Sequence, residues 1–155
     1  MPGEPFEGRK IFTVESANAS LPLVRAIVAD LAQLSREVVE RRERLSLLLA
    51  GRERGTHDPY GEELSQIEEE LEKDSQRLQE YVDELRQLGV EPKNGPDGLV
   101  DFPALLEGRP IYLCWKLGEA EVLHWHELDA GFRGRQALTA GTAADGSDST
   151  DRIVG

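Results

Sequence analysis

The chain has 155 residues, the length of one ordinary domain that can bury a substantial core. Its formal net charge of −12 disfavours nucleic acid and anionic membrane surfaces as partners, because both are negatively charged. The single cysteine excludes an intramolecular disulfide and favours a reducing compartment. No apolar window reaches the length of a membrane span, and the N-terminus lacks the pattern of a signal peptide. We therefore expect a cytoplasmic protein.

The first part of the chain contains several signals for loops and helix starts. Residues 1–10 are polar, with two prolines and two glycines, and are expected to form a flexible N-terminus. Thr13 is placed to cap a brief helix over about 14–19. Ser20 is placed to cap a second and much longer helix, which tolerates Pro22 in its first turn.

The first long helix is expected over about 21–50. Apolar residues recur there on alternating three- and four-residue steps: Leu21, Val24, Val28, Leu31, Val38, Leu45 and Leu49. Ser35 and Arg42 occupy the two polar positions of this seam. The glycines and the Asp-Pro pair within 51–59 then indicate a turn.

The second long helix is expected from residue 59 or 61 to residue 88. Its seam is a heptad repeat: Leu64, Ile67, Leu71, Asp74, Leu78, Tyr81, Leu85 and Leu88. Gly89 follows at once and suits a helix C-cap. Two long helices joined by a short turn run antiparallel, so the pattern predicts a coiled-coil hairpin.

Charges in and around the seams favour pairing of the two helices. Folding the chain at the turn places Arg42 about one layer from Asp74, where they either form an ion pair or reach out into water. Residues 59–91 hold eleven acids and three bases, whereas residues 21–54 hold seven bases and five acids. The acidic run on the second helix is more often a solvated face than a binding site.

Some apolar residues of the first helix lie off its seam: Leu23, Ile27, Leu34, Val39, Leu47 and Leu48. A two-helix coiled coil does not bury them, so a second apolar face needs cover. The C-terminal segment can cover one end of the hairpin. Self-association can cover the rest, so a dimer is expected.

The segment after the helices reads first as a linker. Residues 92–98 are rich in turn-forming residues. Residues 99–102 suit a short extended piece, and residues 103–106 suit one helical turn capped by Asp101.

A β-hairpin is expected over about 109–128. Residues 111–117 alternate and form the first strand, residues 118–119 the turn, and residues 122–128 the returning strand. The cross-strand pairs would be Lys116 with Glu121, Tyr112 with Trp125, and Trp115 with Val122. Because a lone hairpin is marginally stable in water, this one must pack on the helices.

The predicted fold is therefore α+β and mostly α. A long antiparallel two-helix coiled-coil hairpin over about 21–88 packs against the small C-terminal β-hairpin, all within one domain over 11–138. Residues 139–155 are small and polar and are expected to form a disordered tail.

Candidate chemistry gathers at the returning strand. His124 and His126 point to one face of a strand and could chelate a divalent metal, with a carboxylate such as Glu119 or Asp101 as a further ligand. The alternative is a pair of half-exposed histidines that bond to their neighbours. Cys114 could act as a nucleophile with His126 as base, although a buried small hydrophobe is favoured.

The glycine-rich stretch that follows offers an anion site. Arg133 and Arg135 present forked donors for a carboxylate or phosphate, or else they pair with glutamates of the second helix. The residues proposed for binding are Trp125, His126, Asp129, Arg133 and Arg135. No P-loop, nucleophile elbow or dinucleotide fingerprint occurs.

Four motifs carry a resemblance to a known family: TVESAN at 13–18, GLVDFP at 98–103, LCWKLGE at 113–119 and WHELDAGFRGR at 125–135. The chain resembles, over about 11–138, an uncharacterised bacterial family known only as a domain of unknown function. The resemblance implies a single small cytoplasmic domain and carries no established activity.

Two functions remain open. The favoured one is a non-enzymatic interaction or assembly module built on the helical hairpin, which self-associates or binds a protein partner. The alternative is a small metal- or anion-binding protein or enzyme, with His126, Arg135 and Asp129 in one cleft. The first is favoured because the helical seams dominate the sequence pattern and no full catalytic set is visible.

Overall fold

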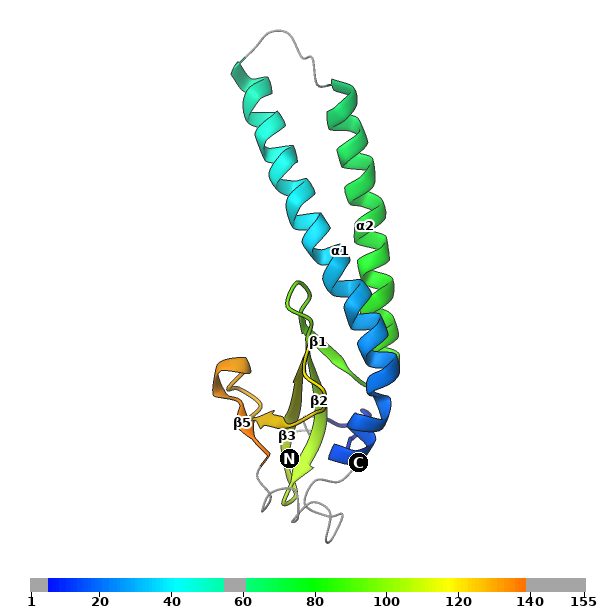
Figure 1. Ribbon diagram of the computed structural model, residues 1–155, viewed down its shortest axis with the longest axis vertical. Coiled ribbons are helices and arrows are strands. Elements are labelled where there is room, and N and C mark those ends of the chain that lie inside the picture. The colour runs from blue at the N-terminus through cyan, green and yellow to red at the C-terminus, as the bar shows by residue number, and fades with distance from the viewer. Residues whose placement is uncertain (1–5, 55–60, 139–155) are drawn as a thin grey trace.

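The computed structural model describes residues 6–54 and 61–138, which form two long helices and an antiparallel sheet (Figure 1). The elements are α1 (Val14–Arg54), α2 (Gly61–Gln87), β1 (Glu91–Asn94), β2 (Leu99–Leu106), β3 (Arg109–Lys116), β4 (His124–His126), the 3₁₀ turn η1 (Phe132–Gly134) and β5 (Gln136–Ala137). The predicted α+β class is confirmed. The expected turn near 55–60 and the expected tail over 139–155 lie outside the described residues.

Helix α1 begins at a reciprocal cap. The Thr13 Oγ1 accepts a hydrogen bond from the Ser16 amide (2.9 Å), and the Ser16 Oγ accepts one from the Thr13 amide (2.8 Å). This is the capping-box arrangement with serine in place of the usual Glu or Gln. The predicted cap at Thr13 is therefore confirmed.

The predicted break between a brief first helix and a long second one is wrong. Helix α1 runs without interruption through Pro22, and the Ser20 hydroxyl donates to the Ala17 carbonyl (2.7 Å) instead of capping a new helix. A proline inside a helix costs one backbone hydrogen bond. Here the helix is held by packing on both sides of it, because Ala17, Leu21 and Val24 are all buried.

Helix α2 ends in a Schellman motif. The Val90 amide donates to the Leu85 carbonyl (2.9 Å), and the Gly89 amide donates to the Arg86 carbonyl (3.0 Å). Gly89 has φ +89°, a conformation that glycine adopts without steric cost. Leu85 and Val90 are both fully buried, so the cap also directs the chain into the core.

The seam of α2 follows the predicted heptad. Near the C-terminal end of α1, however, the buried seam lies one residue earlier than predicted. Leu48 is 5% exposed and Leu49 is 41% exposed, although Leu49 was the predicted seam residue.

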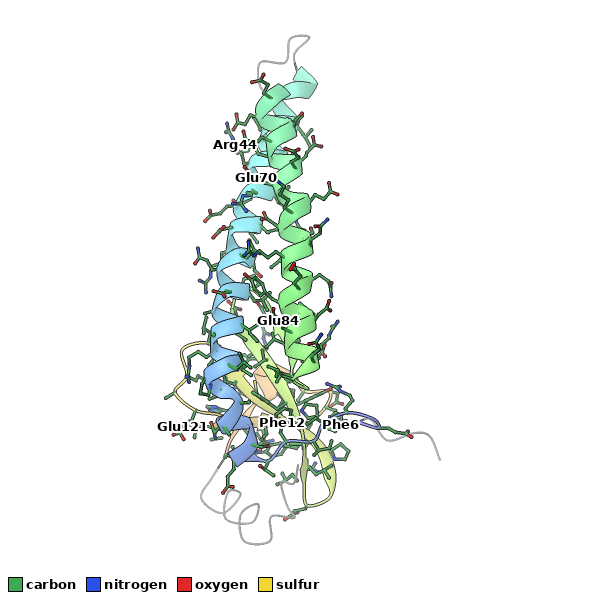
Figure 2. The ribbon with its side chains drawn as sticks, turned by 90° about the vertical axis from the view of Figure 1, so that its right-hand side faces the viewer. Phe6, Phe12, Arg44, Glu70, Glu84 and Glu121 are labelled. Atoms are coloured by element: carbon green, nitrogen blue, oxygen red, sulfur yellow. The ribbon has the colours of Figure 1, made fainter. Side chains whose placement is uncertain are left out.

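The same shift corrects the predicted ion pair of the seam. Asp74 pairs with Arg41 and not with Arg42. Arg41 also reaches the carboxylates of Glu70 (3.2 Å) and Glu37 (3.5 Å), so one guanidinium joins both helices. Other charged side chains, such as Arg44 and Glu84, line the outside of the hairpin (Figure 2).

The apolar residues of α1 that lie off the predicted seam were expected to need cover, and the fold buries some of them and leaves others exposed. Ile27 and Leu48 are buried. Leu23, Val39 and Leu47 are exposed, at 54%, 46% and 68%. None of the described helices is both long enough and apolar enough to cross a membrane.

Within the described residues the sheet has five strands in the order β1-β2-β3-β4-β5, and all neighbours are antiparallel. Residues 99–106 form one long strand, so the predicted helical turn capped by Asp101 is wrong. Pro103 is tolerated because its carbonyl accepts from the Phe12 amide (2.7 Å). That edge of β2 faces away from β3, where the missing amide proton is not needed. Strands β1 and β5 were not predicted.

The register between β3 and β4 differs from the predicted one by one residue. Leu113 lies opposite Trp125, and Tyr112 lies opposite His126, so none of the predicted cross-strand pairs forms. The expected two-residue turn is instead a loop over 117–123. Glu119 shapes this loop, because its carbonyl accepts from the Trp115 indole (2.9 Å) and its carboxylate accepts from the Lys116 amide (2.8 Å).

The two faces of the sheet differ in character. The inner face packs on α1 and α2 and carries Val100, Phe102, Ile111, Leu113, Trp115 and Trp125. A slip of one residue moves a side chain to the opposite face, so the observed register turns Trp125 inward and His126 outward. The outer face therefore carries Asp101, Cys114 and His126, while buried Phe6 packs on Tyr112 (5.2 Å between ring centroids).

Candidate functional site

A polar cluster on the outer face of the sheet brings together one side chain from each of three neighbouring strands. Asp101 on β2, Cys114 on β3 and His126 on β4 are all buried. Register places Asp101 directly opposite Cys114. His126 lies opposite Tyr112, two residues along β3 from Cys114 and on the same face of the sheet. One nitrogen, one sulfur and one oxygen from these residues all lie within 4.8 Å of one another. We call this set the Asp-Cys-His cluster.

Hydrogen bonds define the protonation of His126. Its Nδ1 donates to the Glu127 carbonyl (2.6 Å), because a carbonyl oxygen can only accept. Its Nε2 donates to the Asp101 Oδ1 (3.0 Å). Burial lowers the pKa of His126, but the hydrogen bonds to Asp101, to Cys114 and to the Glu127 carbonyl raise it to about 10. The ring is therefore an imidazolium at neutral pH, in a buried ion pair with Asp101.

Cys114 is fully buried, as the favoured interpretation of the sequence expected, and its surroundings do not suit the alternative role of a nucleophile. Burial raises the pKa of its thiol above the ordinary value, although the hydrogen bond to His126 acts in the opposite direction. A protonated thiol is a weak nucleophile, and an imidazolium cannot accept its proton. The pair therefore lacks the protonation states of a cysteine and its general base.

A cavity of about 240 Å³ opens beside the cluster. Asp101 and His126 reach it from the sheet, and Tyr112 and Phe132 contribute aromatic walls. Asp129, which is exposed, lines the same cavity. Two of the predicted site residues, His126 and Asp129, are thus brought together.

Arg135 and His124 belong to a second group, next to the first. Arg135 bonds to the Glu119 carboxylate and to the His124 Nδ1, and its guanidinium lies 4.7 Å from the centroid of the Phe132 ring. The predicted pairing of this arginine with α2 glutamates is wrong, because Glu119 in the β3–β4 loop takes that place. Phe132 contacts Arg135 and lines the cavity, but Arg135 is not among the residues that line it. A single cleft for His126 and Arg135 stays a prediction.

The remaining predicted site residues have other surroundings. Trp125 is buried on the inner face of the sheet, where the Arg109 guanidinium lies 5.8 Å from its ring centroid. Arg133 is exposed on η1. In the described part of the chain, the group of residues that could hold a metal contains His126 but not His124.

The sequence suggested Asp101 as a metal ligand beside the histidines, and Cys114 as a nucleophile with His126 as its base, but it did not bring all three residues into one site. The alternation of β3 and β4 carried the necessary signal, because the correct register puts Cys114 and His126 on one face. The error in register and the missed strand β2 together hid the cluster.

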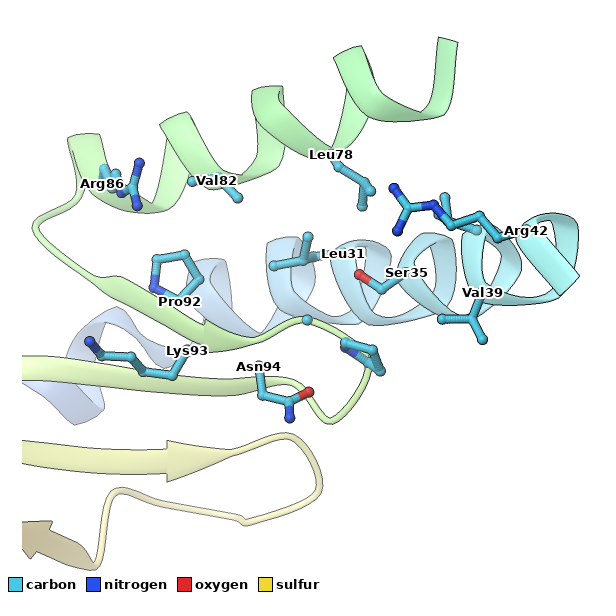
Figure 3. A pocket seen from close by; sticks show the side chains of 13 residues that line it. Leu31, Ser35, Val39, Arg42, Leu78, Val82, Arg86, Pro92, Lys93 and Asn94 are labelled. Atoms are coloured by element: carbon cyan, nitrogen blue, oxygen red, sulfur yellow. The ribbon is translucent and has the colours of Figure 1, made fainter. Parts of the chain in front are cut away.

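A second feature, which we call the basal groove, lies between α1, α2 and the turn that joins β1 to β2 (Figure 3). Its volume is about 370 Å³. The walls are mostly apolar: Leu31, Val38, Val39, Leu78, Val82 and Pro92. The turn approaches α1 so closely that a Cβ at Gly95 would lie 2.5 Å from the Ser35 Oγ.

Cations stand at the ends of the basal groove. Arg86 pairs with Glu91 (3.1 Å), whereas Arg42 forms no ion pair with any residue in the described ranges. Arg42 is exposed, and its side chain extends over the groove beside Leu78 (Figure 3). The groove therefore offers an apolar surface with an available guanidinium at one end.

Comparisons with known proteins agree with the resemblance in the sequence. No curated protein and no solved structure matches the chain. The model of one family, described as an uncharacterized conserved protein (DUF2203), matches residues 10–138. This range includes α1, α2 and strands β1 to β5 of the described part of the chain, together with the Asp-Cys-His cluster and the basal groove. Because the match covers most of the chain, the protein belongs to the DUF2203 family.

Proposed function

We propose that this protein is a non-enzymatic interaction module whose basal groove receives an acidic, partly apolar segment of a protein partner. The observation that supports this is the combination of accessible apolar walls with the guanidinium of Arg42, which has no ion-pair partner within residues 6–54 and 61–138. The other features of the groove bear on which partner it suits.

The walls of the groove offer hydrophobic surface that a partner could bury. Leu31 and Val38 form a buried floor, while Val39 is 46% exposed and Leu78 and Val82 are half-buried. Burying one aliphatic side chain fully is worth about 1.5–3 kcal/mol. A few partner side chains in this groove would supply a modest affinity, typical of a transient interaction.

The charges at the rim favour an acidic segment. A guanidinium binds a carboxylate through two parallel hydrogen bonds, and Arg42 is available for such a pair. The chain carries a net charge of −12, so most of its surface repels an acidic partner. The cations of the groove would therefore fix where that partner docks, more than how tightly it binds.

The Asp-Cys-His cluster supports a non-enzymatic function, because its imidazolium and its protonated thiol are not poised for nucleophilic chemistry. The helical hairpin would present the groove at its base and hold its geometry. We further infer a cytoplasmic setting, which suits the single reduced cysteine.

Two matched variants on α1 test this proposal. Val39 lines the groove and Leu23 lies outside it, and both are exposed to a similar degree, at 46% and 54%. A photo-crosslinking side chain placed at Lys93 in otherwise native protein is expected to capture a discrete partner in cells. Val39→Glu should abolish that capture, because the new carboxylate repels the acidic groups of the partner segment and places a charged group against its apolar side chains. Leu23→Glu should leave it intact.

Binding measurements with the purified partner and the purified chain then distinguish a role of the groove from its absence and from self-association. The captured partner should bind the purified chain, and Val39→Glu should weaken this binding by at least about tenfold, or about 1.4 kcal/mol. Equal capture by the two variants would refute the role of the groove. A crosslink between two copies of this chain, with a light-scattering mass of twice 17.2 kDa, would show that a second copy occupies the groove and would refute the proposal of a separate protein partner.

A further inference from the structure

We propose that Asp101, Cys114 and His126 form a binding site for one zinc-class divalent ion, with a carboxylate oxygen, Sγ and Nε2 as its ligands. This site lies on the outer face of the sheet and does not depend on the basal groove. The proposal follows from the donor set, the spacing, the hydrogen bond behind the histidine and the adjoining cavity.

The donor set and its spacing suit zinc. Zinc accepts sulfur, nitrogen and oxygen ligands, whereas a thiolate ligand disfavours magnesium and calcium. Tetrahedral bonds of about 2.0–2.3 Å separate neighbouring ligand atoms by about 3.3–3.8 Å. The three donor atoms already lie within 4.8 Å of one another, so small side-chain adjustments are sufficient. The donors come from three paired strands, which hold their relative positions.

The hydrogen bond behind His126 is the one expected of a metal ligand. Its Nδ1–H donates to the Glu127 carbonyl (2.6 Å), which fixes the ring and directs Nε2 toward Asp101 and Cys114. Metal-bound histidines almost always donate their second ring nitrogen to a carbonyl or carboxylate. The supporting contact is therefore in place before any ion binds.

The charges of the donor set balance the charge of the ion. A divalent ion takes the place of the proton between Nε2 and the Asp101 carboxylate and of the thiol proton of Cys114, so two protons leave to solvent and no redox partner is needed. The ion, the thiolate and the carboxylate sum to zero, so the occupied site leaves no unbalanced buried charge.

The cavity beside the cluster supplies a fourth position. Its volume of about 240 Å³ exceeds that of a water molecule, and Asp101 and His126 both border it. Three protein ligands plus an open position are typical of zinc sites that exchange a bound ligand. Tyr112 and Phe132 would limit the ligand to a small one.

Cobalt(II) is a direct probe of this site. The full chain without an affinity tag is stripped with a chelator and titrated with cobalt(II). One ion per chain is expected, with the near-ultraviolet absorption of a thiolate–cobalt bond. Because Cys114 is the only cysteine, Cys114→Ser should remove that absorption. His126→Gln should weaken binding by more than about tenfold.

His124→Gln is the matched control, since His124 lies two residues away but outside the cluster. It should bind cobalt(II) like the native chain, and zinc should displace the cobalt from both. Absence of the thiolate–cobalt absorption in the native chain would overturn the proposal, whatever the variants do. Binding that survives Cys114→Ser unchanged would also overturn it. Zinc should raise the melting temperature of the native chain but not that of Cys114→Ser, which is nearly isosteric and expected to fold.

Discussion

The buried ion pair of His126 and Asp101 predicts a specific loss of stability at alkaline pH in metal-free protein. The pKa of His126 is raised from about 6.5 in the unfolded chain to about 10 in the folded one, against the effect of burial, by its hydrogen bonds. A raised pKa means that the folded state binds the proton more tightly. The stabilisation is therefore complete below about pH 6.5 and is lost as the pH rises toward 10.

The size of the effect follows from the shift. Each pKa unit corresponds to about 1.4 kcal/mol, so a shift of this size is worth roughly 3–5 kcal/mol. That range agrees with the cost of breaking a buried ion pair by removing one partner, about 3–5 kcal/mol. Asp101, Cys114 and Tyr112 are the titratable groups that face the ring from β2 and β3. The Cys114 thiol has a raised pKa and stays protonated over most of this window.

Urea unfolding in the presence of a chelator, at about pH 6.5, 8 and 9.5, measures this loss. The control is His126→Gln, whose amide does not titrate. The difference in free energy of unfolding between native protein and variant should be largest at the lowest pH and should shrink as the pH rises. If the two curves stay parallel, His126 is not charged in the folded protein, and the reasoning fails.

Three further substitutions and one control substitution test the fold. Gly89→Ala should lower the free energy of unfolding by about 1–2 kcal/mol, because φ is +89° there, and urea titration would show it. Leu71→Asp should lower the thermal midpoint of the helical circular dichroism by placing a charge in the partly buried seam, whereas Leu47→Asp, at a position 68% exposed, should leave it nearly unchanged. Asn18→Ala should cost about 1–3 kcal/mol, because the Val122 amide then loses its acceptor (2.7 Å), and hydrogen exchange at that amide should accelerate.

The helices were predictable from the sequence to the extent that their signals are local. Seven-residue spacing of leucines depends only on helix geometry, so the predicted seam residues of α2 from Leu64 to Leu85 are all buried or partly buried. The cap at Thr13 is also local and was recognised. The expected break near Pro22 was wrong because burial against the sheet outweighs the helix-breaking tendency of one proline.

The sheet was harder to predict because its register depends on contacts between distant residues. Pro103 was assigned to a helical turn, whereas in the fold Phe12, which is remote in sequence, pairs with the edge of β2 at this point. The loop after β3 has a glycine that suggests a tight turn, but the bonds made by Glu119 lengthen it. The Asp-Cys-His cluster needs three strands in correct alignment, so Cys114 and Asp101 could each be linked to His126 from the sequence, while the joining of all three could not be predicted.

The close approach of Gly95 to Ser35 marks a point about which a tilt of the helical hairpin on the sheet would displace its far end. Gly95 has no side chain and faces the Ser35 side chain directly, and even a Cβ at Gly95 would come within 2.5 Å of the Ser35 Oγ, so the turn and α1 cannot approach further. From Ser35 to the end of α1 at Arg54 the helix extends by roughly 28 Å at 1.5 Å per residue. A rotation of about 10° around this fulcrum moves the far end by roughly 5 Å. Any rearrangement that tilts the helix on the sheet is therefore amplified along the hairpin, and a pair of distance labels, one on the sheet and one near the tip, would record it more readily than labels near the fulcrum.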